Sequence, residues 1–171
     1  MSAPAVIDAL EFARSAQESS GSVSVSALRR LEDLLYDSAG SLSYELHGRR
    51  DERNRPRLAV VVTGELHLQC QRCLGLLDYP VDVMNSLLVL APGTEPEDEQ
   101  EDPDAPDTIE ADAELDVAAL IEDEVLLSLP LAPRHPDGAC VSRFDAQLPQ
   151  ENAAHSAFQK LAALKRPANK H

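Results

Sequence analysis

The sequence predicts an α+β protein: a curved antiparallel sheet with N-terminal helices, one strong helix after an acidic loop, and a flexible C-terminal tail. Apolar residues recur at helical spacing near the N-terminus and again after residue 116, but they alternate with polar residues between positions 42 and 83. The alternating runs are joined by short connections, whereas parallel strands would need a long crossover. We therefore expect one α+β domain over residues 1–140 and an extended tail over 141–171.

Two helices are expected before the sheet. Residues 7–17 show helical spacing, and the Ser/Gly-rich stretch 19–24 should interrupt the chain after them. Ser26 is a suitable N-cap for a second helix, which ends at or just before Gly40. The apolar positions of this second helix are Leu28, Leu31 and Leu35.

After residue 40 the periodicity changes from helical to extended. The β-branched run 58–63 is typical of a buried strand. The residues that alternate with polar neighbours in the other runs are Leu42, Tyr44 and Leu46, then Leu66, Leu68 and Cys70 beyond Gly64, and finally Tyr79, Val81 and Val83. These runs predict the strands of the sheet.

An acidic segment and a helix follow the predicted strands. Residues 91–114 are rich in Pro, Asp and Glu without periodicity, which predicts a flexible loop that is either a solubilising linker or a docking strip for a basic partner. Asp116 can cap the helix, and Pro130 ends it. Its apolar stripe consists of Val117, Leu120, Ile121 and Val125. The acids at 122–124 predict a solvated helix face, with a carboxylate cluster for metal binding or catalysis as the alternative.

Charge and composition restrict the function. The formal net charge is −15, and residues 91–129 contain 15 acidic and no basic side chains. Such a chain is a poor non-specific binder of polyanions, so any contact with nucleic acid must be local. No apolar run approaches the roughly 18 residues that cross a membrane, and no secretory signal is evident, so we expect a cytoplasmic protein without a membrane partner.

The most informative motif is Cys70-Gln-Arg-Cys73-Leu-Gly75, which lies between two predicted strands. In a zinc knuckle, two thiolates converge on one side of a tight turn, and Gly75 can adopt the positive φ that such a turn demands. A redox Cys-x-x-Cys pair would instead be expected at the start of a helix. The odd number of cysteines also argues against a framework of disulfides.

Two further ligands are available after the strong helix, because His135 and Cys140 lie in a short, turn-prone loop. Together with Cys70 and Cys73 they would form a closed Cys₃His site for a structural zinc ion. The alternatives are a cluster of reduced thiols and a histidine that only forms a hydrogen bond in a turn. The 61 intervening residues make the spacing undiagnostic by itself.

An arginine-rich segment, 48–57, separates two of the predicted strands. Its arginines are Arg49, Arg50, Arg53, Arg55 and Arg57. Arginine binds phosphate groups through paired hydrogen bonds, so this segment is a candidate contact for RNA. A contact with an acidic protein and an ordinary solvated hairpin tip are the alternatives.

The tail contains one short helical pattern, formed by Phe158, Leu161 and Leu164 and followed by basic residues. So short a helix is marginal alone and should require docking on a partner. The sequence contains no phosphate-binding glycine loop, no nucleophile elbow and no His-Glu-x-x-His helix, so we expect no catalysis and no small-molecule substrate.

Several of these segments together resemble the bacterial YceD family of large ribosomal RNA subunit accumulation proteins. The segments are Cys-Gln-Arg-Cys-Leu at 70–74, the helix at 120–130, Pro133-x-His135 leading to Cys140, and the tail at 157–165. This chain departs from the family with Ala-His-Ser at 154–156, where an Asn-Pro pair is common.

The resemblance implies a role in the synthesis, processing or stability of 23S ribosomal RNA without a known enzymatic step. We therefore expect a non-catalytic accessory factor in ribosome biogenesis that binds precursor large-subunit rRNA or a ribosome assembly protein. The alternatives are a metal-assisted ribonuclease acting on precursor rRNA and an acidic protein adaptor without RNA contact.

Overall fold

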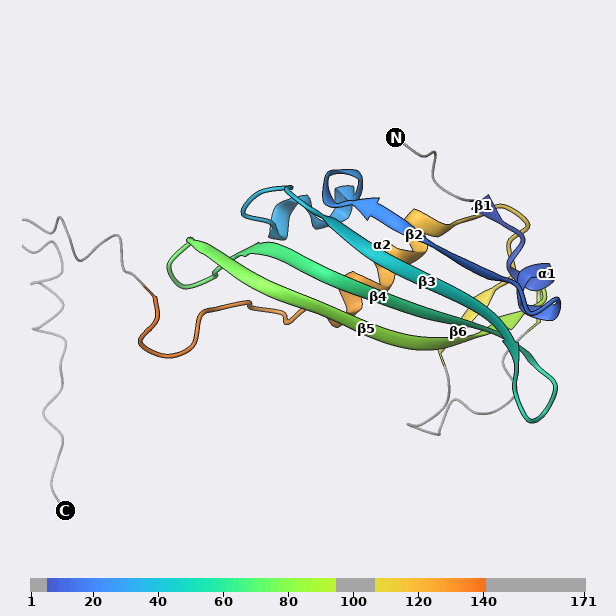
Figure 1. Ribbon diagram of the computed structural model, residues 1–171. Helices are drawn as coiled ribbons and strands as arrows, with labels where there is room; N and C mark the ends of the chain where they lie inside the picture. The colour runs from blue at the N-terminus through green and yellow to red at the C-terminus, as the bar shows by residue number, and fades with distance from the viewer. Residues whose placement is uncertain (1–5, 95–106, 141–171) are drawn as a thin grey trace, which may run out of the picture.

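A single twisted sheet dominates the computed structural model, which describes residues 6–94 and 107–140 (Figure 1). Its strands pair in the order β2-β3-β4-β5-β6. Their bounds are Glu18–Ser24 for β2, Ser41–Arg50 for β3, Pro56–Gln69 for β4, Leu76–Leu90 for β5 and Thr108–Glu110 for β6. All pairs are antiparallel except β5 with the short β6. The α+β class and the mainly antiparallel sheet are confirmed.

The hairpin of β4 and β5 is the longest feature of the molecule. Its register runs without interruption from the pair Arg57 and Leu88 to the pair Gln69 and Leu76. We expected two runs separated by Gly64, but the structure has one strand. The side chain of Leu42 lies 2.7 Å from the position that a Cβ at Gly64 would occupy, so a residue without a side chain suits this point. At about 3.3 Å per residue, the 14-residue β4 extends for roughly 45 Å and separates the two hairpin turns.

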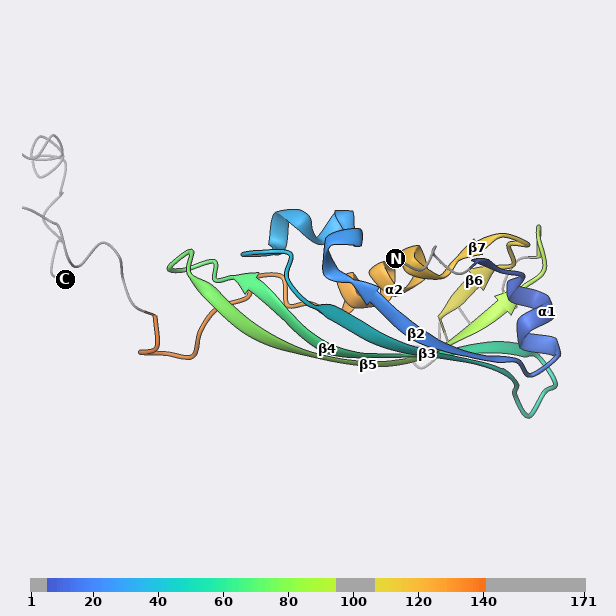
Figure 2. The ribbon, with the colours of Figure 1, turned by 45° about the horizontal axis from the view of Figure 1, so that its top comes forward.

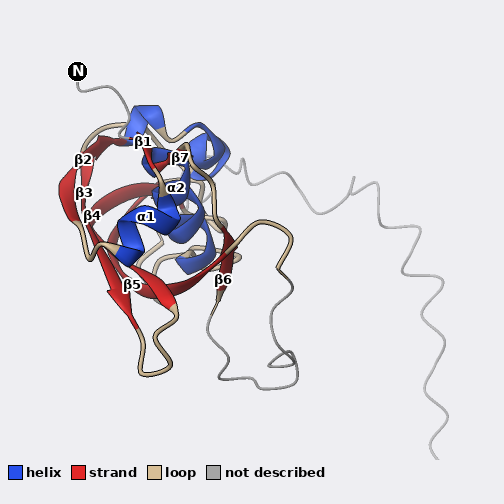
Figure 3. Ribbon diagram, turned by 90° about the vertical axis from the view of Figure 1, so that its right-hand side faces the viewer, coloured by secondary structure: helices blue, strands red, loops and turns tan. Residues whose placement is uncertain are grey.

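The helices cover one face of the sheet (Figure 2). They are α1 (Ala9–Arg14), the 3₁₀ helices η1 (Val25–Ala27) and η2 (Arg29–Leu34), and α2 (Val117–Ser128). Inward-facing side chains of the strands meet these helices in one core, and alternate residues of each strand point to the opposite face. Viewed from the end, the strands bend around α1 and α2 (Figure 3). The arrangement buries the apolar stripe of each helix against the sheet.

The first predicted helix is present but short. Asp8 caps α1 by accepting a hydrogen bond from the N–H of Glu11 at 2.8 Å. Ile7 lies outside the helix, in β1 (Val6–Ile7), which pairs with β7 (Leu115–Asp116). The predicted break at residues 19–24 is wrong, because these residues form most of the edge strand β2 and pair with β3. Serine and glycine have a weak local preference for strands, so the sequence did not predict β2. The strand forms because the edge of β3 supplies its hydrogen bonds.

The second predicted helix is also different in the structure. Two 3₁₀ helices replace it, and Ser26 lies inside η1 rather than at an N-cap. Leu28 separates the two helices with φ −86° and ψ 81°, a conformation that ends the helical path. This break lets both Leu28 and Leu31 enter the core, where they are fully buried.

The predicted strong helix is confirmed as α2, and Asp116 caps it through a hydrogen bond from the N–H of Ala118 at 2.8 Å. The prediction of a solvated acidic face is wrong for Glu122 and Glu124, since both are buried. Glu122 accepts the N–H of Arg30 in η2 at 2.6 Å.

Glu124 is held by a different element, since it accepts a hydrogen bond from Asn85 of β5 at 3.0 Å. Burial raises the pKa of Glu124, and the hydrogen bond from Asn85 opposes this shift only in part. These two glutamates therefore join α2 to η2 and to the sheet. We expected a loop over residues 91–114. In the structure, residues 108–110 of this segment form the strand β6.

Candidate metal centre

The turn between β4 and β5 is shaped by its own backbone. Cys70 donates its N–H to the carbonyl of Gly75 at 3.0 Å, and Leu74 donates to the carbonyl of Cys70 at 2.8 Å. The positive φ of this turn belongs to Leu74, at 56°, and not to Gly75 as we expected. A Cβ at Gly75 would lie 3.4 Å from the sulfur of Cys73. That distance is an ordinary van der Waals contact, so neither the backbone conformation nor lack of space requires a glycine here.

A distant segment runs beside this turn. Residues 131–140 follow α2, and the carbonyl of Pro133 accepts the N–H of Gln71 at 2.8 Å. His135 approaches the carbonyl of Leu76 through its Nε2 at 2.8 Å. When Nε2 carries the proton of this hydrogen bond, the Nδ1 lone pair faces the cysteines. This is the tautomer that a metal ligand needs, with its other nitrogen held by a carbonyl.

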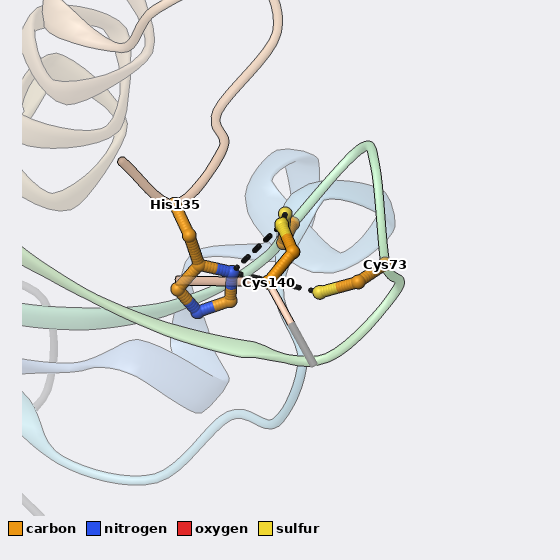
Figure 4. A group of neighbouring side chains, drawn as sticks. Cys73, His135 and Cys140 are labelled. Atoms are coloured by element: carbon orange, nitrogen blue, oxygen red, sulfur yellow. Dashed lines mark hydrogen bonds between the residues drawn. The ribbon is translucent and has the colours of Figure 1, made fainter. Parts of the chain in front are cut away.

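The four predicted ligands meet at one point. The sulfurs of Cys70, Cys73 and Cys140 and a ring nitrogen of His135 all lie within 4.8 Å of one another. Figure 4 shows Cys73, His135 and Cys140 directed toward one another from two separate segments. The Nδ1 of His135 is 3.5 Å from the sulfur of Cys73 and 3.6 Å from that of Cys140. The sulfurs of Cys70 and Cys140 are 3.7 Å apart.

These separations fit a tetrahedral site. Four ligands that each lie 2.0 to 2.3 Å from a zinc ion are about 3.3 to 3.8 Å from one another. The described cysteines are free thiols, so all three sulfurs are available. Three soft sulfurs and one imidazole form a donor set that suits zinc. Because the four side chains would fill a tetrahedral site, no coordination position would remain open for water.

The electrostatics of the turn favour a thiolate at Cys70. Burial alone would raise the pKa of this buried thiol, but the backbone N–H groups of Cys73, His135 and Arg72 lower it to about 5. The N–H of Gly75 acts in the same direction on Cys73, yet burial and the neighbouring Cys70 and Cys140 outweigh it and raise the pKa of Cys73. A cation would relieve the repulsion between these thiolates.

Arg72 supports the site from outside. Its Nε donates to the sulfur of Cys140 at 3.0 Å, and its Nη1 lies 3.3 Å from the carboxylate of Asp137. A Cys₃His set around a divalent cation has a net charge of −1, which the guanidinium offsets. Sequence reasoning did not single out Arg72, because its partners are more than 60 residues away.

The predicted arginine contact lies at the opposite end of the long hairpin. Arg55 and Arg57 are half-buried, and the carboxylate of Asp51 accepts from the Nε of Arg55 at 2.8 Å and from that of Arg57 at 3.4 Å. Burial raises the pKa of Asp51, but the N–H and side chain of Arg55, together with Arg57, lower it to about 2. The side chains of Arg49, Arg50 and Arg53 are exposed. Asp51 therefore holds the turn between β3 and β4 in shape, while the side chains of Arg49, Arg50 and Arg53 are exposed to solvent. We refer to this turn, residues 48–57, as the arginine hairpin.

A second group of possible ligands, which the sequence did not suggest, lies on the outer face of the sheet. Glu65, His67 and Asp78 bring their ligand atoms within 4.8 Å of one another, but both carboxylate residues are exposed. The Nδ1 of His67 lies 2.8 Å from the carboxylate of Asp37, an interaction that raises the pKa of His67. The Nδ1 of His67 is thus already engaged by Asp37, which lies outside this group.

Some predictions fall outside the described residues. They concern the tail residues Phe158, Leu161 and Leu164 and residues 95–106 of the acidic segment. Among the described residues, no helix is long and apolar enough to cross a membrane.

The fold and the site define a class of protein: an α+β protein with a five-stranded sheet, in which the longest hairpin meets the segment after α2 at a Cys₃His cluster. Residues 58–165 match the family model described as large ribosomal RNA subunit accumulation protein YceD. The chain therefore belongs to the YceD family, and the matched residues include both halves of the cluster and the arginine at 72. No solved structure matches the chain.

Proposed function

We propose that this protein is a non-catalytic accessory factor that supports the synthesis, processing or stability of 23S rRNA by binding precursor large-subunit RNA. The match over residues 58–165 to a family named for accumulation of the large ribosomal RNA carries this proposal. A protein of this family with a basic contact surface can affect rRNA levels by binding alone, without a reaction step.

The arginine hairpin is the surface that supports RNA contact. The side chains of Arg49, Arg50 and Arg53 are exposed on a turn that Asp51 holds in shape. An ordered turn loses less conformational entropy when it binds phosphates, which favours recognition by arginine. The rest of residues 1–140 is strongly acidic and would repel RNA, so within those residues binding should be confined to this end.

We further propose that the Cys₃His cluster holds one structural zinc ion. The donor set supports this assignment, because three thiolates and one imidazole complete a tetrahedral site. When bound, the ion would tie residues 131–140 to the β4–β5 turn. A closed set of four protein ligands also favours a structural role over hydrolysis, which needs an open coordination position.

A cellular test separates RNA contact from other roles. Deletion of the gene should lower 23S rRNA relative to 16S rRNA, and the intact gene should restore the ratio. A variant with Arg49, Arg50 and Arg53 all changed to Ser should restore it poorly and should crosslink less precursor RNA.

The matched control for this test loses the same charge at exposed arginines elsewhere. It carries Ser in place of Arg14, Arg29 and Arg134, and it should restore the ratio fully. If the hairpin variant restores the ratio fully and crosslinks as much precursor RNA as the unchanged protein, the arginine hairpin does not bind RNA. Metal-dependent cleavage of precursor rRNA by the purified protein would contradict the non-catalytic role.

The metal is tested by elemental analysis of protein purified without chelators. About one zinc ion per chain is expected from the single set of four ligands. Cys73→Ser should lower this content, whereas Ser43→Ala on the sheet should leave it unchanged. Protein that is folded but free of metal would refute the zinc assignment.

A further inference from the structure

Two sulfurs of the candidate metal centre touch across the two segments that meet there. The sulfurs of Cys70 and Cys140 lie 3.7 Å apart, although the two residues are 70 positions apart in the sequence. A disulfide bond requires its sulfurs to be about 2 Å apart. A small approach of one side chain toward the other would therefore bring this pair to bonding distance, and the bond would link two distant parts of the chain.

The backbone of both segments holds the two cysteines at this distance. The N–H of Gln71, directly after Cys70, donates to the carbonyl of Pro133 at 2.8 Å. On the other segment, the N–H of Ala139 donates to the carbonyl of Pro136 at 3.1 Å and closes a turn directly before Cys140. The contact between the sulfurs is thus a consequence of the fold and does not need a metal ion to explain it.

The two cysteines differ in their surroundings. Cys70 is fully buried, whereas Cys140 is partly exposed. The Nε of Arg72 donates to the sulfur of Cys140 at 3.0 Å and brings a positive charge against it. Reactive cysteines lie in such electropositive, partly exposed surroundings. A small oxidant would therefore reach Cys140 first, and Cys70 would lie behind it as the nearest thiol.

Cys73 is the competing partner for either sulfur. It is partly exposed, and its sulfur lies within 4.8 Å of both other sulfurs. Its own contact is with the Nδ1 of His135 at 3.5 Å (Figure 4). The sulfur–sulfur contact at 3.7 Å and the guanidinium both involve Cys140, so they favour the bond between the two segments over a bond within the β4–β5 turn.

We propose that peroxide oxidises Cys140 and that Cys70 then forms a disulfide bond with it. In the first step, the thiolate of Cys140 attacks one oxygen of hydrogen peroxide and the O–O bond breaks. A sulfenic acid forms, and the hydroxide that leaves takes up a proton to become water. In the second step, the thiolate of Cys70 attacks the sulfur of the sulfenic acid. The S–O bond breaks, the S–S bond forms, and a second hydroxide becomes water. The two sulfurs lose two electrons, which the peroxide gains.

Oxidation would exchange one link between the segments for another. The disulfide takes two of the four predicted zinc ligands, and Cys73 and His135 alone are too few for a closed zinc site, so the ion would be released. Residues 131–140 would stay joined to the β4–β5 turn by a covalent bond, and a thiol reductant would reverse the change. The inference rests on the proposed zinc ion only for this release, because the disulfide needs only the two sulfurs.

Peptide mapping of the full chain tests the pairing directly. The zinc-loaded protein is treated with hydrogen peroxide in slight molar excess, and its remaining thiols are blocked before digestion with trypsin. Cleavage after arginine places the three cysteines in three separate peptides, 58–72, 73–134 and 135–143. Mass spectrometry should find 58–72 linked to 135–143. A chromophoric chelator should record release of about one zinc ion per disulfide formed, and dithiothreitol with zinc should restore both thiols and metal.

Two matched variants separate the disulfide from the metal. Cys73→Ser and Cys140→Ser each lose one predicted ligand sulfur, so both should bind zinc weakly. Cys73→Ser keeps the proposed pair and should still form the disulfide, whereas Cys140→Ser should lose it. Equal disulfide formation in the two variants would overturn the proposal, as would a map of the unchanged protein that links 58–72 to 73–134. A non-reducing gel should show a monomer, and a crosslinked dimer would overturn the proposal as well.

Failure of this inference can be told apart from failure of the proposed zinc site. A chain that holds zinc and keeps all three thiols free after peroxide treatment would overturn the disulfide and leave the zinc assignment standing. A chain that never binds zinc but gives the link between 58–72 and 135–143 would refute the zinc assignment and support the disulfide.

Discussion

The guanidinium of Arg72 should strengthen metal binding through one hydrogen bond. Its Nε donates to the sulfur of Cys140 at 3.0 Å, and Arg72→Gln removes that charged donor. A hydrogen bond to a charged group contributes about 1.5 to 3 kcal/mol. The Arg72 side chain is 43% exposed, and solvent screening reduces this contribution to about 1 kcal/mol. We therefore expect the dissociation constant for zinc to rise about fivefold.

The assay is competition for zinc between the full chain and a chromophoric chelator at fixed pH and salt. Arg134→Gln is the matched control, since it removes the same charge from the neighbouring segment without removing a donor to a ligand sulfur. Arg72→Lys keeps the charge but loses the planar donor, so it should fall between the two.

Two results would refute this reasoning. An unchanged affinity in Arg72→Gln would show that the hydrogen bond contributes nothing to the bound state. Equal weakening by Arg72→Gln and Arg134→Gln would show that long-range charge, and not the contact with Cys140, sets the affinity.

Three further predictions concern the fold. Gly48→Ala should lower the free energy of unfolding by about 1 to 3 kcal/mol in urea titration, because its Cβ would lie 2.2 Å from the carbonyl oxygen of Phe12. Glu124→Gln should raise the melting temperature at neutral pH. Burial raises the folded-state pKa of Glu124, so the ionised form costs stability above that pKa, and the advantage of the variant should vanish below pH 4.5. Asp37→Asn should lower the pKa of His67 in an NMR titration. The hydrogen bond that His67 donates to Asp37 raises that pKa, so the stability it contributes is present below pH 6.5 and is lost as pH rises through the raised value.

Elements with strong local periodicity were predicted well. The alternation around Leu42 to Leu46 became β3, the β-branched run became part of β4, and α2 begins at Val117, directly after its predicted cap Asp116. In each case the residues that alternate or recur in the sequence are those that the core buries. Local pattern is sufficient here because it selects both the element and the face that packs.

Elements whose hydrogen bonds come from distant residues were missed. β2 consists largely of serine and glycine and exists because the edge of β3 is open to it. The burial of Glu122 and Glu124 depends on an N–H from η2 and an amide from β5. The sequence of α2 alone places these carboxylates at the edge of the apolar stripe of the helix. It cannot identify their partners, which lie in other elements.

At the candidate metal centre, the sequence by itself determined the types of the possible ligands and the turn that holds the first pair. Tertiary structure decided that His135 and Cys140 reach that turn, that Leu74 takes the left-handed conformation, and that Arg72 contacts Cys140. The physical reason is that residue chemistry and periodicity are local properties of the chain. Convergence across 61 residues depends instead on how α2 packs against the sheet, and so on where the segment after α2 can run.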